Sequence, residues 1–95
     1  MRFKPNQRTT HLGTPRKFSI IPVVDAPEGF QRAFFTTVNV GQRPTVFAVR
    51  PDAPSGQWRI DRGVFGNLWE AFPGLNEIFE TPELAAQALV ARFPQ

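Results

Sequence analysis

The chain of 95 residues contains no cysteine and no tyrosine, and it has one histidine, His11. The absence of cysteine excludes disulfides, thiolate nucleophiles, zinc ribbons and cysteine-ligated iron–sulfur clusters. A single histidine cannot build a His-rich metal site, so we expect no metal and no cofactor. Stability must then come from packing alone, which suits a reducing compartment, and we expect a cytoplasmic protein.

The sequence also lacks the motifs of common enzymes. Gly63 and Gly66 are not followed by Lys-Ser or Lys-Thr, and the dinucleotide-binding glycine spacing is absent as well. The only serines, Ser19 and Ser55, lie outside any Gly-x-Ser-x-Gly motif. Threonines near His11 offer hydroxyls, but a catalytic triad also needs a third residue and a rigid scaffold. We therefore expect a protein that is not an enzyme.

Long hydrophobic runs are missing too. The longest, residues 20–24, is interrupted by Pro22 and is far shorter than the roughly 18–20 residues that a membrane helix needs. The first residues carry charges with no apolar stretch behind them, which is not the pattern of a secretory signal. We expect no membrane partner.

The residues that are present suffice for one folded domain. Apolar residues make up 41% of the chain and charged residues 20%, a balance that disfavours disorder. Residues 1–15 are polar, basic and without clear periodicity, which predicts a basic N-terminal arm. Residues 16–95 are expected to form a single α+β domain.

Alternating apolar and polar residues predict strands in the first two thirds of the domain. Trp58 and Ile60 are expected to point inward, with Arg59 and Asp61 outward. Within the longest strand, Phe34 and its alternate neighbours would share one face and Phe35 the other. The expected strands are residues 17–21, 30–40, 45–50 and 57–62, separated by turn-forming residues at 25–29, 41–44 and 51–56.

The apolar period changes toward the end of the chain. Phe65, Leu68, Trp69 and Phe72 recur at the spacing of one helical face, which predicts a short aromatic helix over 65–72. Residues 76–79 are expected to form a last short strand. Thr81-Pro82 is typical of a helix start, because threonine caps free amides and proline fits the first turn. The apolar stripe of that helix is expected to comprise Leu84, Ala85, Ala88 and Leu89, reaching Phe93.

The predicted fold is therefore a small antiparallel sheet of about four to five strands, with the aromatic helix and the C-terminal helix packed on one face. Phe72→Ala would then cost about 3–5 kcal/mol if Phe72 belongs to the core. Near-zero loss of stability with lost binding would instead make Phe72 an anchor for a partner.

Charge is distributed unevenly along the chain. Residues 1–24 carry five cations and no acidic residue, whereas residues 70–95 carry four glutamates and Arg92. Arginines also stand on the predicted strands, where the sheet face without helices would display several together. Cations and aromatic rings are the usual means of holding nucleic acid or an acidic protein surface. The candidate partner-binding residues are Arg2, Lys4, Arg8, Arg16, Lys17, Arg50, Arg59, Arg62, Phe65 and Trp69.

Each of these features has an ordinary structural explanation. The arm charges would only solvate an extended terminus. Arg59 would pair with Asp61 on the same strand face, and Arg50 would pair with nearby Asp52. Most of the ten phenylalanines and two tryptophans would fill the core, because a small domain without disulfides needs large side chains there.

One local resemblance accompanies these patterns. Residues 57–61, followed by the capped helix start at 79–86, resemble the strand-then-helix arrangement of small sheet-plus-helix DNA-binding domains of the integrase arm-binding kind. The resemblance covers under half of the chain, and it implies that Arg- and Trp-bearing strands lie in the major groove. Residues 63–78 depart from it, because those domains have a tight turn there.

Two hypotheses of function remain. The first is a protein-interaction module that occupies the surface of a macromolecular partner, as an inhibitor or adaptor of nucleic-acid-handling machinery from a prokaryotic mobile element. Nine arginines against two lysines indicate GC-rich codons and hence a bacterial or phage source. The second is direct DNA or RNA binding through the arm and the strand arginines. The modest net charge of +3 favours the first.

Overall fold

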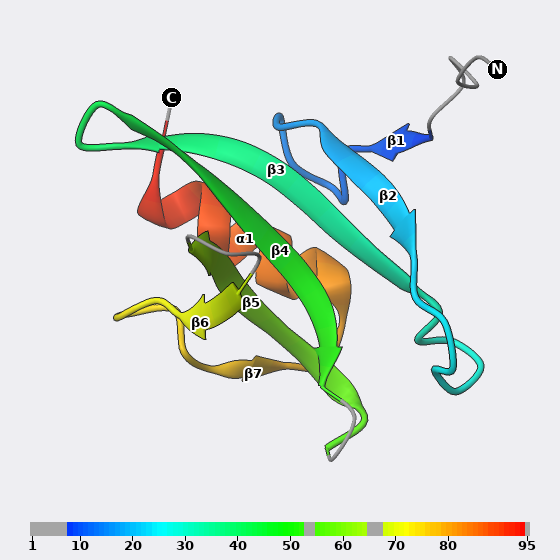
Figure 1. The fold of residues 1–95 in the computed structure, drawn as a ribbon. Helices are drawn as coiled ribbons and strands as arrows, with labels where there is room; N and C mark the ends of the chain where they lie inside the picture. The colour runs from blue at the N-terminus through cyan, green and yellow to red at the C-terminus, as the bar shows by residue number, and fades with distance from the viewer. Residues whose placement is uncertain (1–7, 53–54, 65–67, 95) are drawn as a thin grey trace, which may run out of the picture.

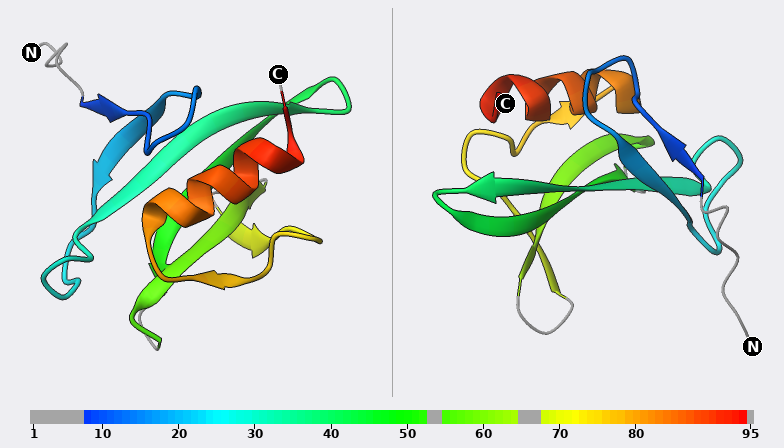
Figure 2. Two further views of the ribbon diagram at one scale, coloured as in Figure 1. Left: turned by 180° about the vertical axis from the view of Figure 1, so that it is seen from behind. Right: turned by 90° about the horizontal axis from the view of Figure 1, so that it is seen from above.

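The structure, a computed structural model, describes residues 8–52, 55–64 and 68–94. Six strands form one antiparallel sheet in chain order, and β7 pairs with β5 (Figure 1). Helix α1 lies against one face of this sheet, and Figure 2 shows that the opposite face carries no helix. The elements are β1 (Thr9–Thr10), β2 (Phe18–Pro22), β3 (Arg32–Val40), β4 (Arg43–Asp52), β5 (Gln57–Val64), β6 (Leu68–Ala71), β7 (Ile78–Phe79) and α1 (Pro82–Arg92).

The predicted α+β class and antiparallel sheet are confirmed. Among the described residues, the sheet has seven strands rather than four to five, because β1 and β6 were not expected as strands. Within the described part of the chain, α1 is the only helix, and no helix is long and apolar enough to cross a membrane.

The predicted aromatic helix over 65–72 is wrong. Residues 68–71 form strand β6, which pairs Trp69 with Gly63 and Leu68 with Val64. A helix would have placed all of its large apolar residues on one face, whereas the strand sends Trp69 to the open side of the sheet. Phe72 follows β6 and turns into the core instead. Pairing with the free edge of β5 outweighs helical periodicity here, since isolated short helices are marginal in water.

The long β3–β4 hairpin sets the register of the sheet. Its two-residue turn has Gly41 at φ 61° and Gln42 at φ 92°, the positive values that match the twist of a tight hairpin. Phe34 then lies opposite Val49, and Thr36 lies opposite Phe47. The predicted placement of Phe34 and Phe35 on opposite faces of β3 is therefore confirmed.

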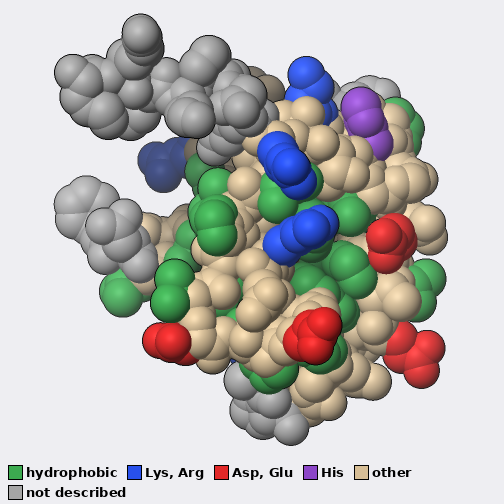
Figure 3. All heavy atoms as spheres, turned by 90° about the vertical axis from the view of Figure 1, so that its right-hand side faces the viewer, with side chains coloured by type: hydrophobic (Ala, Val, Ile, Leu, Met, Phe, Trp, Pro, Cys, Tyr) green, Lys and Arg blue, Asp and Glu red, His purple; other side chains and the backbone are tan. Residues whose placement is uncertain are grey.

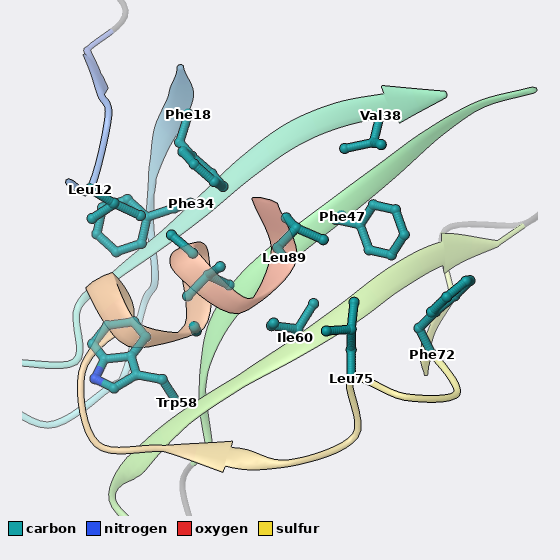
Figure 4. Packing of buried hydrophobic residues seen from close by; sticks show 13 residues of the cluster. Leu12, Phe18, Phe34, Val38, Phe47, Trp58, Ile60, Phe72, Leu75 and Leu89 are labelled. Atoms are coloured by element: carbon teal, nitrogen blue, oxygen red, sulfur yellow. The ribbon is translucent and has the colours of Figure 1, made fainter. Parts of the chain in front are cut away.

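The core lies between the sheet and α1 (Figure 4). Phe18, Phe47, Ile60 and Leu89 are fully buried there. The ring of Phe47 lies 5.4 Å from that of Phe72 and 5.3 Å from that of Phe93, forming an aromatic cluster at one end of the core. Trp58 and Ile60 point inward as predicted.

Helix α1 begins where the sequence indicated. The Thr81 hydroxyl accepts a hydrogen bond of 3.1 Å from the Leu84 amide, and Pro82 occupies the first turn. The buried residues are Ala85, Ala86 and Leu89. Leu84 is 46% exposed, so its predicted place in the apolar stripe is wrong, because the small alanines allow the helix to approach the sheet on a different side.

The second half of the basic N-terminal arm is tied to the domain. Strand β1 pairs Thr9 with Ser19 of β2, and the Leu12 side chain is buried in the core. Arg16 donates a hydrogen bond of 2.9 Å to the Thr37 carbonyl of β3. These contacts place Arg8 and Arg16 on the edge of the sheet.

Candidate functional site

The sheet face opposite α1, hereafter the open face, holds the candidate site. Residues on β3, β4 and β5 that alternate with the core residues point to it, and β6 adds one aromatic ring. Their placement follows from the register, which pairs Phe35 with Ala48, Ala48 with Asp61, and Arg50 with Arg59. The side chains that form the centre of the open face are Phe35, Arg50, Arg59, Asp61 and Trp69.

A buried carboxylate is the hub of this face. Asp61 is only 2% exposed, although no helix covers it. Arg50 Nη1 donates to Asp61 Oδ2 at 2.9 Å, and Arg59 donates to Asp61 Oδ1 from Nε at 3.1 Å and from Nη2 at 3.0 Å. Arg59 Nη1 also lies 3.5 Å from Asp52 Oδ1. Both oxygens of Asp61 are therefore engaged, which offsets the cost of removing a charge from water.

Two aromatic rings lie beside the buried carboxylate. The Phe35 and Trp69 rings are 5.3 Å apart, and the Arg50 guanidinium lies 5.6 Å from the Trp69 ring centre. The Trp69 ring packs directly over Gly63, where an added Cβ would be in ordinary van der Waals contact with it at 3.4 Å. The open face therefore has an apolar part, formed by Phe35 and Trp69. Beside it lies a charged part, in which two arginines are paired with two aspartates.

Two hollows adjoin this centre. The first, of about 470 Å³, lies between Arg50, Phe35 and the connection from β2 to β3, and its walls are mostly apolar. The second, of about 610 Å³, lies over the other end of β4 and β5 and includes Trp69. Its rim carries Leu68, which is 63% exposed, and Val46, which is also exposed. Exposed apolar side chains beside a hollow are typical of interaction sites.

The structure brings only some of the predicted residues together. Arg50, Arg59 and Trp69 share the open face. Arg62 lies on the helix side, where its guanidinium forms an ion pair with Glu70 and lies 5.1 Å from the Phe72 ring centre. The predicted site residues Arg2, Lys4 and Phe65 lie outside the described residues.

A second group of predicted cations lies elsewhere. Arg8, Arg16 and Lys17 flank strands β1 and β2, and none of them forms an ion pair with another described residue. Figure 3, which faces this side of the molecule, shows Lys and Arg side chains gathered near its centre. The basic residues therefore form two separate groups, of which one is neutralised and the other is not.

Sequence reasoning placed Asp61 outward beside Arg59 but missed its burial and its role as the hub. It also missed Phe35 as a surface aromatic. The signal for Phe35 was its alternation with Phe34, since only one face of β3 can meet the helix. The predicted pairing of Arg59 with Asp61 is confirmed, whereas Arg50 pairs with Asp61 rather than with Asp52.

Clusters of possible metal ligands and the position of His11 are the remaining features of the described residues. Across residues 8–52, 55–64 and 68–94, no three His, Asp or Glu side chains gather in a way that could hold a metal ion. His11 stands in an exposed turn, where its carbonyl accepts hydrogen bonds from the amide and hydroxyl of Thr14.

Trp58 bears on the resemblance to DNA-binding sheets. Its ring is buried beneath α1, 5.6 Å from Phe30 and 5.9 Å from Phe34, so this strand does not present its tryptophan to a groove. Comparisons with protein-family models, with curated proteins and with solved structures gave no match.

Proposed function

We propose that this chain is a non-enzymatic protein-interaction module that uses its open face to occupy the surface of a protein partner. The observation that carries the proposal is the combination of surface aromatic and aliphatic side chains with arginines that already have carboxylate partners. Tryptophan and arginine are the residue types that most often anchor protein interfaces.

The charge balance of the strands separates this proposal from nucleic-acid binding. Arg50 and Arg59 are paired with Asp61 and Asp52, and Arg62 is paired with Glu70. A protein that neutralises phosphates needs cations that are free to replace counterions. On the open face, the guanidiniums of Arg50 and Arg59 face the carboxylates of Asp61 and Asp52, so that face has no excess of positive charge for phosphates. Arg32 and Arg43 also stand on strands, but the register places them on the helix side. A protein surface, by contrast, accepts a mixed and balanced face.

The apolar part of the open face supports the same proposal. Val46 is exposed near the half-buried ring of Trp69, and Phe35 continues the apolar surface across β3. Burying such a patch removes apolar area from water, which is worth about 25 cal/mol for each Å². If the partner handles nucleic acid, its DNA or RNA would come near Arg8 and Lys17. An inhibitor or adaptor of such machinery would then use the open face for the protein and these cations for the nucleic acid.

The test is capture of a partner from a nuclease-treated lysate of cells that carry the gene. Val46→Ser removes an exposed apolar side chain from the open face, and Leu84→Ser removes one from the exposed side of α1. We expect one protein to be captured by the original chain and by Leu84→Ser, but not by Val46→Ser. Equal capture by both variants would refute the proposal.

A second candidate function is direct nucleic-acid binding, favoured by the unpaired cations Arg8, Arg16 and Lys17. Affinity would then fall steeply with salt, with a slope of about −0.9 per neutralised phosphate of duplex DNA. The double variant R8E/K17E should abolish the mobility shift, and Arg43→Glu at the distant hairpin should weaken it much less. No shift at low salt would exclude this function.

A further inference from the structure

We propose that Arg50 and the first hollow bind an acidic side chain and a neighbouring apolar side chain of one extended segment of the partner. This inference rests on the proposed function, because it specifies which chemistry of the partner the open face receives. Arg50 would supply the charged contact, and the hollow between Arg50 and the β2–β3 connection would take the apolar side chain.

The hydrogen bonds of the two arginines distinguish their roles. Arg59 uses Nε, Nη1 and Nη2 toward Asp61 and Asp52, so its donors are committed. Arg50 uses only Nη1, toward Asp61, among the residues that the structure describes. A guanidinium has five N–H donors in a planar fork, so Arg50 keeps donors for a second carboxylate.

Arg50 is also held in position before any ligand arrives. Asp61 fixes one edge of its guanidinium, and the Trp69 ring lies 5.6 Å from its Cζ. The Arg50 side chain remains 39% exposed. A charged group that is already oriented loses little conformational entropy on binding, which improves affinity for a matching anion.

The first hollow has the size and lining for an apolar side chain. Its volume of about 470 Å³ falls within the range of small-ligand sites. Two acidic residues lie on its wall: Asp25, which is exposed to solvent at the β2–β3 connection, and Asp52, whose carboxylate is engaged by the Ser55 hydroxyl at 2.6 Å and by Arg59. The apolar lining includes Ile21, Val23, Pro27, Phe30, Ala33 and Phe35.

The position of Arg50 favours an internal acidic residue over a chain terminus. Arg50 lies between the first hollow, which it lines, and Trp69, which lines the second hollow. A segment with its acidic side chain on Arg50 can therefore place one apolar side chain in each direction. In an extended segment, side chains at i, i+2 and i+4 point to the same side. The expected pattern is apolar, acidic and apolar at those three positions.

The experiment titrates the 95-residue chain with the capped peptide Leu-Ser-Glu-Ser-Leu and follows amide and Arg Nε–H signals by NMR. We expect saturable shifts at Arg50, Ala33 and Phe35. The capped Gln analogue should bind about tenfold more weakly, because it loses the charge-assisted hydrogen bond to Arg50. Equal binding of the two peptides would overturn the proposal, and so would the absence of shifts at Arg50.

Variants of the protein distinguish binding at this site from non-specific binding of the peptide. Arg50→Gln should reduce affinity for the Glu peptide to that of the Gln peptide, and Arg32→Gln, a cation on the other face, should leave it unchanged. Val24 is 81% exposed on the wall of the first hollow, so its substitution does not threaten the fold. Val24→Glu should weaken the Glu peptide about twofold to threefold, while Val24→Gln should not.

Two further outcomes are informative. One distinguishes an internal acidic side chain from a chain-terminal carboxylate, and the other distinguishes failure of this inference from failure of the proposed function. If N-acetyl-leucine, whose carboxylate is a chain terminus, binds as tightly as the capped peptide, the internal-segment proposal is wrong. If the peptide does not bind but Val46→Ser still loses the captured partner, this inference fails while the proposed function stands.

Discussion

The two faces of the sheet achieve burial by different means, although the same strands form both. On the helix side, Phe34 and Phe47 are buried by α1 and by other rings. On the open side, Asp61 is equally buried, but its carboxylate is held by two arginine side chains and not by a helix. Long amphipathic side chains can therefore seal a sheet face where no helix does.

This difference has a functional consequence. An apolar core is stabilised by close packing, and its side chains are not accessible to a partner. A cover of arginines keeps donors and ring faces at the surface, which is what the proposed interaction requires. The expected energetic signature is a large cost of mutation on the helix side and a smaller cost with a loss of binding on the open side.

The largest expected effect contrasts two phenylalanines on neighbouring strands. Phe47→Ala should lower the free energy of unfolding by about 3–5 kcal/mol, because it removes a fully buried ring from an aromatic cluster. Phe35→Ala should cost about 1–1.5 kcal/mol, since its ring is only half-buried. Urea unfolding measures both, and equal losses would mean that the open face is a second core.

Next comes the carboxylate at the hub of the open face. Asp61→Ala should cost about 1–3 kcal/mol, because both guanidiniums lose their partner but remain partly hydrated. Asp52→Ala, which removes a longer contact, should cost less than about 1 kcal/mol. Thermal unfolding of the two variants compares them, and an Asp61→Ala protein as stable as the original would show that the hub is dispensable.

The N-cap of helix α1 is expected to make a third, smaller contribution to stability. Thr81→Ala removes the hydroxyl that accepts from the Leu84 amide and should cost about 1 kcal/mol. Thr81→Ser keeps a hydroxyl and is the matched control. If both variants lose the same stability in urea unfolding, the cap is not the cause.

The smallest effect on stability is expected for the solvent-exposed ion pair between Arg62 and Glu70 on the helix side. Glu70→Gln leaves Arg62 against the Phe72 ring and should cost less than about 0.5 kcal/mol. High salt should erase even that difference. A loss comparable with that of Asp61→Ala at any salt concentration would remove the distinction between buried and exposed pairs.

Local patterns predicted much of the fold. Strand positions, the face of Phe34, the inward direction of Trp58 and the cap at Thr81 all follow from periodicity and propensity over a few residues. The segment 65–72 failed because its helical spacing and its strand pairing compete, and the partner strand lies outside the local window. Leu84 failed because two alanines decide which side of α1 approaches the sheet.

The candidate site was predictable only as a set of residue types. Arg50, Arg59, Arg62 and Trp69 all stood out in the sequence. The register between neighbouring strands decides which of their side chains meet, and this register cannot be read from the sequence of one strand. Arg50 reaches Asp61 because β4 runs antiparallel to β5 with Arg50 opposite Arg59. Nothing within β5 alone indicates that Asp61 would be covered from β4.

The amino-acid sequence by itself determined the class of fold, the two-faced character of the strands and the absence of thiol chemistry, because these depend on composition and on neighbours along the chain. Only the tertiary structure decided that one aspartate would be buried between two arginines, and that one of those arginines would keep donors free. Such contacts join strands through register and side-chain reach, which are properties of the assembled sheet.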